Sequence, residues 1–401
     1  MSQEIKRSTQ VVPAWLTRDY VEQKLRSYYK NDTLRLDNLD IKLALGNAEN
    51  YSSVITRIYV DFADAGPAAQ VLLSYGVYDR ELELYERILP QMADVVRNEL
   101  ADSRKLFAGT VYVDRQRDSI IFEDMSLENY RVADRLKKLD LEHTHLVLEK
   151  LVNFHAAGAA MAERQPGIFA KNFDRGFFNQ HTRGYEPIMK NLLMALSRSL
   201  ELEPELCQRY QAKIDRLVDN VMEYGERSTS IVPGDFVTLA HGDLWTTNIM
   251  FQYDDEGHPI NAIFIDFQFS AWNSPAIDLH YFFSTALQAD IRLKKQPELV
   301  QFYYYKLKAA LRKVKYSGNV PSLFVFLQQF RNRAFYAAFA SLIFEPTMTY
   351  TGKEEASMDQ IISLSEKGMR FKDDAFQAEA TRKKMRLTLP FLDHLGLLDE
   401  M

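Results

Sequence analysis

Three polar side chains between Leu239 and Asp278 are of the types that move a phosphoryl group. Asp243 precedes Asn248 by five residues, and Asp266 follows Asn248 by eighteen. Transfer of a phosphoryl group from ATP to a hydroxyl needs an acceptor for the hydroxyl proton and oxygen ligands for Mg²⁺. One aspartate can accept the proton, while the asparagine and the second aspartate can supply the oxygens. The spacing therefore raises the hypothesis of a phosphotransferase.

A predicted β-hairpin would bring two of these residues together. The apolar runs Ile249–Phe251 and Ile260–Ile265 flank the sequence DDEGHP, whose Asp, Gly and Pro residues favour a turn. Folding the second run back on the first places Asn248 and Asp266 at the same end of the hairpin. We therefore expect the catalytic chemistry at that end.

Each of the three residues also has a purely structural interpretation. Asp243 could be a turn aspartate in a Gly-Asp-Leu loop, and Asn248 a loop asparagine that satisfies nearby backbone groups. Asp266 ends an apolar run, so its carboxylate would be buried at a cost that a Mg²⁺ ion would offset. A salt bridge from Asp266 to an arginine is the structural alternative.

The longer pattern resembles a known family. The wording HGDLWTTNIMF, followed by DFQ at 266–268, is similar to the ecdysteroid kinase-like family, in the aminoglycoside/choline kinase branch of the protein-kinase-like fold. Other segments agree in order, from GNAENYSSVITRIYV at 46–60 to LPFLDHLGLLD at 389–399. The resemblance implies an α+β fold with a small β-rich lobe and a large, mainly helical lobe. It also implies ATP and Mg²⁺ as cofactors.

The resemblance assigns roles residue by residue. Asp243 would be the catalytic base, Asn248 and Asp266 the metal ligands, and His241 and Asp278 the supports of the catalytic loop. Alternatively, Asp278 could simply cap the helix that follows it. The implied nucleotide-binding residues are Gly46, Asn47, Ala48, Glu49, Asn50, Tyr51 and Ser52 in a loop that covers the phosphates, Glu81 on the first helix of the small lobe, and Glu123 and Met125 at the hinge.

One position departs from the family pattern. Kinases of this fold carry a lysine on the third strand that binds the phosphates and pairs with the helix glutamate. If Glu81 is that glutamate, the lysine position falls on Ser74 or a neighbour within Leu72–Gly76, and none of these residues is basic. A substitute cation among Arg57, Lys42 and Arg80 would preserve an active kinase. Without a substitute, the chain would be a pseudokinase that binds a ligand or a partner.

Composition narrows the class of protein further. The chain has 401 residues, 46% of them hydrophobic, and a net charge of −6 with a pI near 5.8, so a large core is expected and nucleic-acid binding is not. Its single cysteine, Cys207, cannot form an intrachain disulfide, which favours a reducing, cytoplasmic location. No leader or transmembrane segment is evident, and we expect a monomer.

The expected organisation is a helical extension over 1–33, a small lobe over 34–124 with the hinge at its end, and a large lobe over 125–401. Strands are predicted at 51–62, 70–75, 108–113 and 119–123, and helices at 13–30, 79–99, 141–163, 186–198, 203–226, 276–288, 297–314, 321–343, 354–370 and 374–388. His155 is expected to be a packed helix residue. The acceptor implied by the resemblance is a lipophilic hydroxyl compound, such as an ecdysteroid-like molecule or a xenobiotic alcohol.

Overall fold

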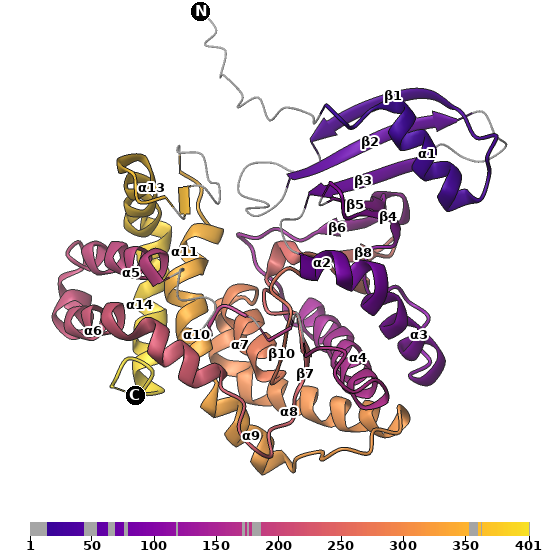
Figure 1. Cartoon of the computed structure of the whole chain (residues 1–401). Coiled ribbons are helices and arrows are strands. Elements are labelled where there is room, and N and C mark those ends of the chain that lie inside the picture. The colour runs from indigo at the N-terminus through magenta and orange to yellow at the C-terminus, as the bar shows by residue number, and fades with distance from the viewer. Residues whose placement is uncertain are drawn as a thin grey trace, which may run out of the picture.

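The computed structural model describes residues 14–43, 54–62, 69–75, 79–117, 119–170, 173–174, 176–178, 186–352, 360–361 and 363–400. Figure 1 shows two lobes, a small one built around a sheet and a large one built mainly of helices. This is the α+β bilobal arrangement of the protein-kinase-like fold, as predicted.

An antiparallel five-stranded sheet forms the small lobe. Its order is β1-β2-β3-β5-β4, with bounds β1 Leu36–Leu43, β2 Val54–Phe62, β3 Ala69–Tyr75, β4 Thr110–Asp114 and β5 Ser119–Glu123. The predicted strands at 51–62, 70–75, 108–113 and 119–123 match β2 to β5 within a few residues. Strand β1 was not predicted, because Asp37, Asn38, Asp40 and Lys42 interrupt its apolar residues and leave no apolar run.

Helix α1 (Arg18–Tyr29) packs on this sheet and confirms the predicted N-terminal helix. It begins where Thr17 accepts a hydrogen bond from the Tyr20 N–H, which satisfies a donor in the first turn. The Tyr20 hydroxyl donates to Asp114 at 2.6 Å, and Leu25 and Ile121 lie in the small cluster beneath the helix. The extension therefore belongs to the sheet's hydrophobic layer.

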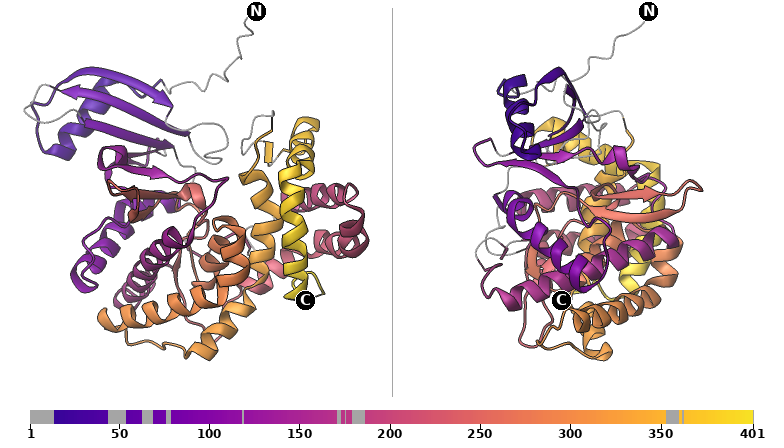
Figure 2. Two further views of the ribbon diagram at one scale, coloured as in Figure 1. Left: turned by 180° about the vertical axis from the view of Figure 1, so that it is seen from behind. Right: turned by 90° about the vertical axis from the view of Figure 1, so that its right-hand side faces the viewer.

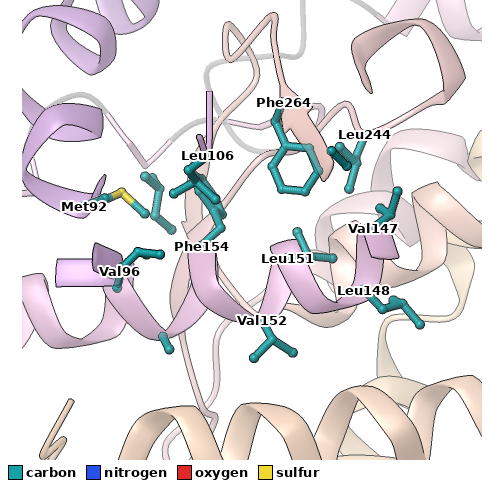
Figure 3. Packing of buried hydrophobic residues seen from close by; sticks show 14 of the residues in the cluster. Met92, Val96, Leu106, Val147, Leu148, Leu151, Val152, Phe154, Leu244 and Phe264 are labelled. Carbon is teal, nitrogen blue, oxygen red and sulfur yellow. The ribbon is translucent and has the colours of Figure 1, made fainter. Parts of the chain in front are cut away.

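The helical segment between β3 and β4 lies against the large lobe. It consists of α2 (Asp79–Glu83), a π-helical turn (Leu84–Ile88) and α3 (Leu89–Glu99). Met92 and Val96 of α3 share one hydrophobic cluster with Leu151 and Phe154 of α4 (Leu141–Arg164), as Figure 3 shows. The main core is thus continuous from this segment into the large lobe.

Two small sheets hold the predicted site. Strands β6 (Tyr130–Val132), β8 (Ile249–Tyr253) and β9 (Pro259–Phe264) form one, in the order β6-β8-β9. Strands β8 and β9 are the predicted hairpin, with Ile249 opposite Phe264. The other sheet pairs β7 (Thr238–Ala240) with β10 (Ala271–Asn273).

Helices make up the rest of the large lobe (Figures 1 and 2). Their bounds are α5 Glu186–Leu200, α6 Pro204–Thr229, α7 Ala276–Thr285, α8 Ala289–Lys313, α9 Leu323–Asn332, α10 Phe335–Phe339, α11 Glu345–Met348, α13 Glu366–Gln377 and α14 Glu379–His394. Within the described residues, no helix has the length and apolar character that crossing a bilayer requires.

Two predicted helices differ from the structure in an informative way. The helix expected over 321–343 is interrupted after α9, where Arg333 is buried and forms an ion pair with Asp235. The helix expected at 297–314 begins earlier, at Ala289, and Pro297 lies inside α8. Local sequence signals at Pro297 and Arg333 were outweighed by tertiary contacts.

Candidate functional site

The catalytic loop predicted from the sequence follows strand β7 and lies beneath helix α7. Asp278, in the first turn of α7, accepts hydrogen bonds from the N–H groups of His241 at 2.7 Å and Gly242 at 2.8 Å. It is fully buried, and Pro275 occupies the N-cap position of the helix. Asp278 thus holds the loop rather than capping the helix.

Asp278 also binds a residue that the sequence analysis treated only as packing. His155 of α4 donates from Nε2 to Asp278 at 2.9 Å, and its Nδ1 accepts from the Tyr303 hydroxyl at 2.6 Å. Burial raises the pKa of Asp278, but the hydrogen bond and charge interaction with His155, together with smaller contributions, leave it below its usual value. The local sequence NFHAAG around His155 does not indicate this contact, because both partners lie more than a hundred residues away in the sequence.

Both ring nitrogens of His241 form hydrogen bonds within the protein. Its Nε2 donates to the Ile265 carbonyl at 3.0 Å, and its Nδ1 accepts from the Asp243 N–H at 3.3 Å. Burial lowers the pKa of His241 to about 4, so the ring stays neutral near pH 7. His241 thereby links the catalytic loop to the end of the β8–β9 hairpin, which is the support role expected of it.

Gly242 is required by both its conformation and its surroundings. Its φ is +85°, and a Cβ at this position would overlap the Phe269 carbonyl oxygen. We expect Gly242→Ala to displace the Asp243 loop and to lower the free energy of unfolding by about 3 kcal/mol, since both strain and overlap must be relieved. Urea unfolding measures the change.

Gly257 in the hairpin turn provides the matched control. Its φ is +89°, but a Cβ added at this position would meet nothing within 4 Å. Gly257→Ala therefore carries the backbone strain alone, about 1 kcal/mol. Equal losses in the two variants would show that the contact with Phe269 contributes nothing.

Asp243 and Asn248 are in direct contact. The Asn248 side-chain amide donates to the Asp243 carbonyl at 2.8 Å and to Asp243 Oδ2 at 3.2 Å. With the amide nitrogen turned toward Asp243, the Asn248 side-chain oxygen faces away from it. Asp243 Oδ1 is buried and has no hydrogen bond of normal geometry within the described residues, although the Tyr281 hydroxyl is near enough to lower the pKa of Asp243.

The hairpin brings Asp266 to the same place. The Ile265 N–H donates to the Asn248 carbonyl at 3.1 Å, which fixes the start of the DFQ segment beside the catalytic loop. Asp266 has a φ of +64°, a conformation that few residues other than glycine adopt. Such a backbone conformation at a non-glycine residue is common at functional sites.

The carboxylates at this site lack a balancing cation in the described part of the chain. Burial raises the pKa of Asp266 to about 7, while burial and the nearby Asp266 carboxylate raise the pKa of Asp243 well above its usual value. No arginine or lysine forms an ion pair with either residue among the described side chains, so the salt-bridge alternative for Asp266 finds no support there. Carboxylate and amide oxygens gathered without a cation fit a divalent metal ion.

Glu81 lies beside Asp266, one of the metal-ligand candidates. Its Oε1 accepts the Phe267 N–H at 3.1 Å, and burial followed by repulsion from Asp266 raises its pKa to about 8. Ser74 lies on β3 opposite Ile120 of β5, within the sheet. Ser74, the position at which the resemblance leads us to expect the lysine, therefore lies in a regular strand.

Of the three substitute cations, only one has a described side chain. Arg80 donates from Nη1 to the Ser270 carbonyl at 2.8 Å, in the segment that follows DFQ. The side chains of Lys42 and Arg57 lie outside the described residues. The whole of the predicted phosphate loop also lies outside the described residues; it consists of Gly46, Asn47, Ala48, Glu49, Asn50, Tyr51 and Ser52.

The predicted hinge residues follow β5 directly. Glu123 accepts hydrogen bonds from the Tyr28 hydroxyl at 2.7 Å and from Lys105 Nζ at 2.8 Å. Met125 is buried at the start of a short 3₁₀ helix. The Glu123 side chain therefore links the end of β5 to α1 and to Lys105, which also pairs with Glu128 beyond the hinge.

An aromatic cavity of about 520 Å³ borders the catalytic loop at Gly242. The Tyr336 hydroxyl, on one wall, donates to the Gly242 carbonyl at 3.3 Å. Phe177 stacks on Phe269 with ring centroids 4.1 Å apart. Other aromatic residues of the lining are Phe169, Phe178 and Trp272. Such a lining suits an apolar ligand.

The two lobes, the loop held by Asp278 and the DFQ segment define a protein of the kinase-like class. A sequence model of the ecdysteroid kinase-like family matches residues 47–316, and the chain belongs to that family. The resemblance seen in the catalytic wording is thus confirmed. No curated protein matches the chain.

Several solved structures are similar in fold. An ethanolamine kinase from Plasmodium vivax is 15% identical, with 91% of this chain and 89% of that chain covered and a TM-score of 0.44. A choline/ethanolamine kinase family protein from Mesorhizobium loti is 13% identical, with 95% and 98% covered and a TM-score of 0.43. An amicoumacin kinase is 10% identical, with 90% and 96% covered and a TM-score of 0.41.

Proposed function

We propose that this protein is an ATP- and Mg²⁺-dependent kinase that phosphorylates a hydroxyl group of a small molecule. The observation that carries the proposal is the convergence of Asp243, Asn248 and Asp266, which are linked by the Asn248 side chain and by the hydrogen bond from Ile265 to Asn248. Family membership supports the same class of reaction.

Each residue has a role in the proposed transfer. Asp243 accepts the proton of the acceptor hydroxyl. The hydroxyl oxygen forms a bond to the γ-phosphorus of ATP, while the bond between that phosphorus and the β-phosphate oxygen breaks and leaves ADP. Asn248 and Asp266 would hold Mg²⁺, which neutralises charge on the phosphates. His241 and Asp278 keep the base in place through the hydrogen bonds described above.

The acceptor is proposed to be lipophilic. The aromatic part of the cavity lining, which includes Phe177, Phe269 and Tyr336, would bury an apolar body beside Gly242, the residue before the base. An ecdysteroid-like molecule or a xenobiotic alcohol fits this description. A cytoplasmic monomer remains our expectation from the sequence.

The rival function is that of a pseudokinase. Its supporting observation is that Glu81 binds the Phe267 N–H, while Ser74 stands where the lysine is expected. Loss of a charge-assisted phosphate contact would weaken ATP binding. The two functions therefore differ in their affinity for Mg–ATP, which a pseudokinase would bind weakly or not at all.

A melting-temperature titration with Mg–ATP separates these functions. We expect a saturable rise that requires Mg²⁺ and is lost in Asp266→Ala, since a ligand of the folded state raises stability with occupancy. Asp255→Ala in the exposed hairpin turn is the matched control and should behave as the unmodified protein. No rise at millimolar Mg–ATP would favour the pseudokinase.

A further inference from the structure

A second cavity of about 530 Å³ lies in the large lobe, lined by α7, α8, α9, α10 and α14 and by the chain that follows α14. No residue of the catalytic loop 241–248 lines it. Its size is within the range of small-molecule sites. It is therefore separate from the proposed acceptor cavity, with which it shares no lining residue.

The lining combines an apolar wall with exposed apolar residues. Phe391 and Leu392 come from α14, while Phe324 is 69% exposed and Leu395 is 46% exposed. Large apolar side chains gathered in the open around a cavity are typical of binding sites. A ligand with an apolar body would cover them.

One polar lining residue offers an unused acceptor. His280 donates from Nε2 to the Phe330 carbonyl at 2.7 Å, and its ring stacks on Phe330 with centroids 3.9 Å apart. With the proton on Nε2, Nδ1 carries a lone pair. That atom is buried and has no hydrogen-bond partner among the described residues. Burial lowers the pKa of His280 to about 4, so the ring remains neutral.

The neighbouring Arg292 offers an unused donor. Its Nη1 donates to the Ser284 carbonyl at 3.3 Å and its Nη2 to Thr388 Oγ1 at 2.7 Å. The Glu345 carboxylate lies 3.7 Å from Nη1 and balances the positive charge of Arg292. The Nε atom alone is buried without a partner in the described part of the chain. Ser284 follows His280 by one helical turn of α7, and both residues line the cavity, as Arg292 of α8 does.

We infer that this cavity binds a neutral lipophilic alcohol. A hydroxyl group both donates and accepts: it can give its proton to His280 Nδ1, and its oxygen is the kind of acceptor that Arg292 Nε–H lacks. A carboxylate has no proton to donate and would face the lone pair of His280. Binding here requires no phosphoryl transfer and goes beyond the proposed function.

Calorimetric titration with 1-octanol and with octanoate tests the inference. We expect saturable binding of octanol, at least about five-fold tighter than octanoate, which corresponds to roughly one hydrogen bond. His280→Phe keeps a ring beside Phe330 but removes the acceptor. This variant should bind octanol about five-fold more weakly than the unmodified protein does and should bind octanoate with little change in affinity.

Two tryptophan variants locate the binding. Ala334→Trp fills the cavity and should abolish octanol binding, whereas Val325→Trp, on an exposed position of α9 outside the lining, should leave it intact. Melting curves establish that each variant is folded, and His280→Phe decides alone if Ala334→Trp is not. Octanoate binding as tight as octanol, octanol binding that survives Ala334→Trp, or no saturable binding would each overturn the inference.

Discussion

Asp243→Asn is expected to lower turnover by about a thousand-fold while Mg–ATP still binds. The amide cannot accept the hydroxyl proton, and general-base assistance contributes about a hundred- to ten-thousand-fold in such reactions. The proposed metal ligands Asn248 and Asp266 are unchanged by this substitution. Release of ADP in the presence of an accepted hydroxyl compound measures turnover, and the melting-temperature rise measures nucleotide binding.

Asp255→Asn is the control, because Asp255 is exposed in the hairpin turn and close in sequence to the site. It should turn over as the unmodified protein does. Normal turnover by Asp243→Asn would remove the base assignment. Loss of Mg–ATP binding in that variant would instead place Asp243 in the nucleotide site.

Asp278→Asn is expected to lower the free energy of unfolding by about 3 kcal/mol. The carboxylate accepts from the N–H groups of His241 and Gly242 and from His155 Nε2 in a fully buried position. An amide of the same shape has one acceptor oxygen and turns N–H groups toward donors, so at least one buried donor loses its partner. Urea unfolding followed by circular dichroism gives the change.

Asp290→Asn on the exposed surface of α8 is the comparison, since its carboxylate lies 3.4 Å from Lys294 and is mostly solvated. A change within about 0.5 kcal/mol is expected for such a surface pair. If Asp278→Asn costs no more than Asp290→Asn, the loop is held by other contacts. Turnover should fall in Asp278→Asn at temperatures where the variant is still folded, because Asp243 follows the released loop.

Much of the fold was predictable because its signals are local. The turn sequence DDEGHP between two apolar runs predicted the β8–β9 hairpin, and the hairpin alone required Asn248 and Asp266 to be neighbours. Apolar periodicity gave α4, α5 and α6 within a few residues of their bounds. The order of the motifs that resemble the family predicted the order of the two lobes along the chain.

The rest depended on contacts between distant segments. Nothing near His155 indicates that it donates to Asp278 and accepts from Tyr303. The approach of Tyr281 to Asp243, and the break at Arg333 caused by Asp235, likewise depend on how helices meet. A single sequence carries no periodic signal for such pairings.

The contacts of α2 change how lobe closure should be understood in this protein. Glu81 binds the Phe267 N–H and Arg80 binds the Ser270 carbonyl, while α3 shares its hydrophobic core with α4. The helical segment is therefore fastened to the large lobe by its own side chains and by hydrophobic packing. A movement that keeps these contacts would therefore take place within the small lobe, between its sheet and α2.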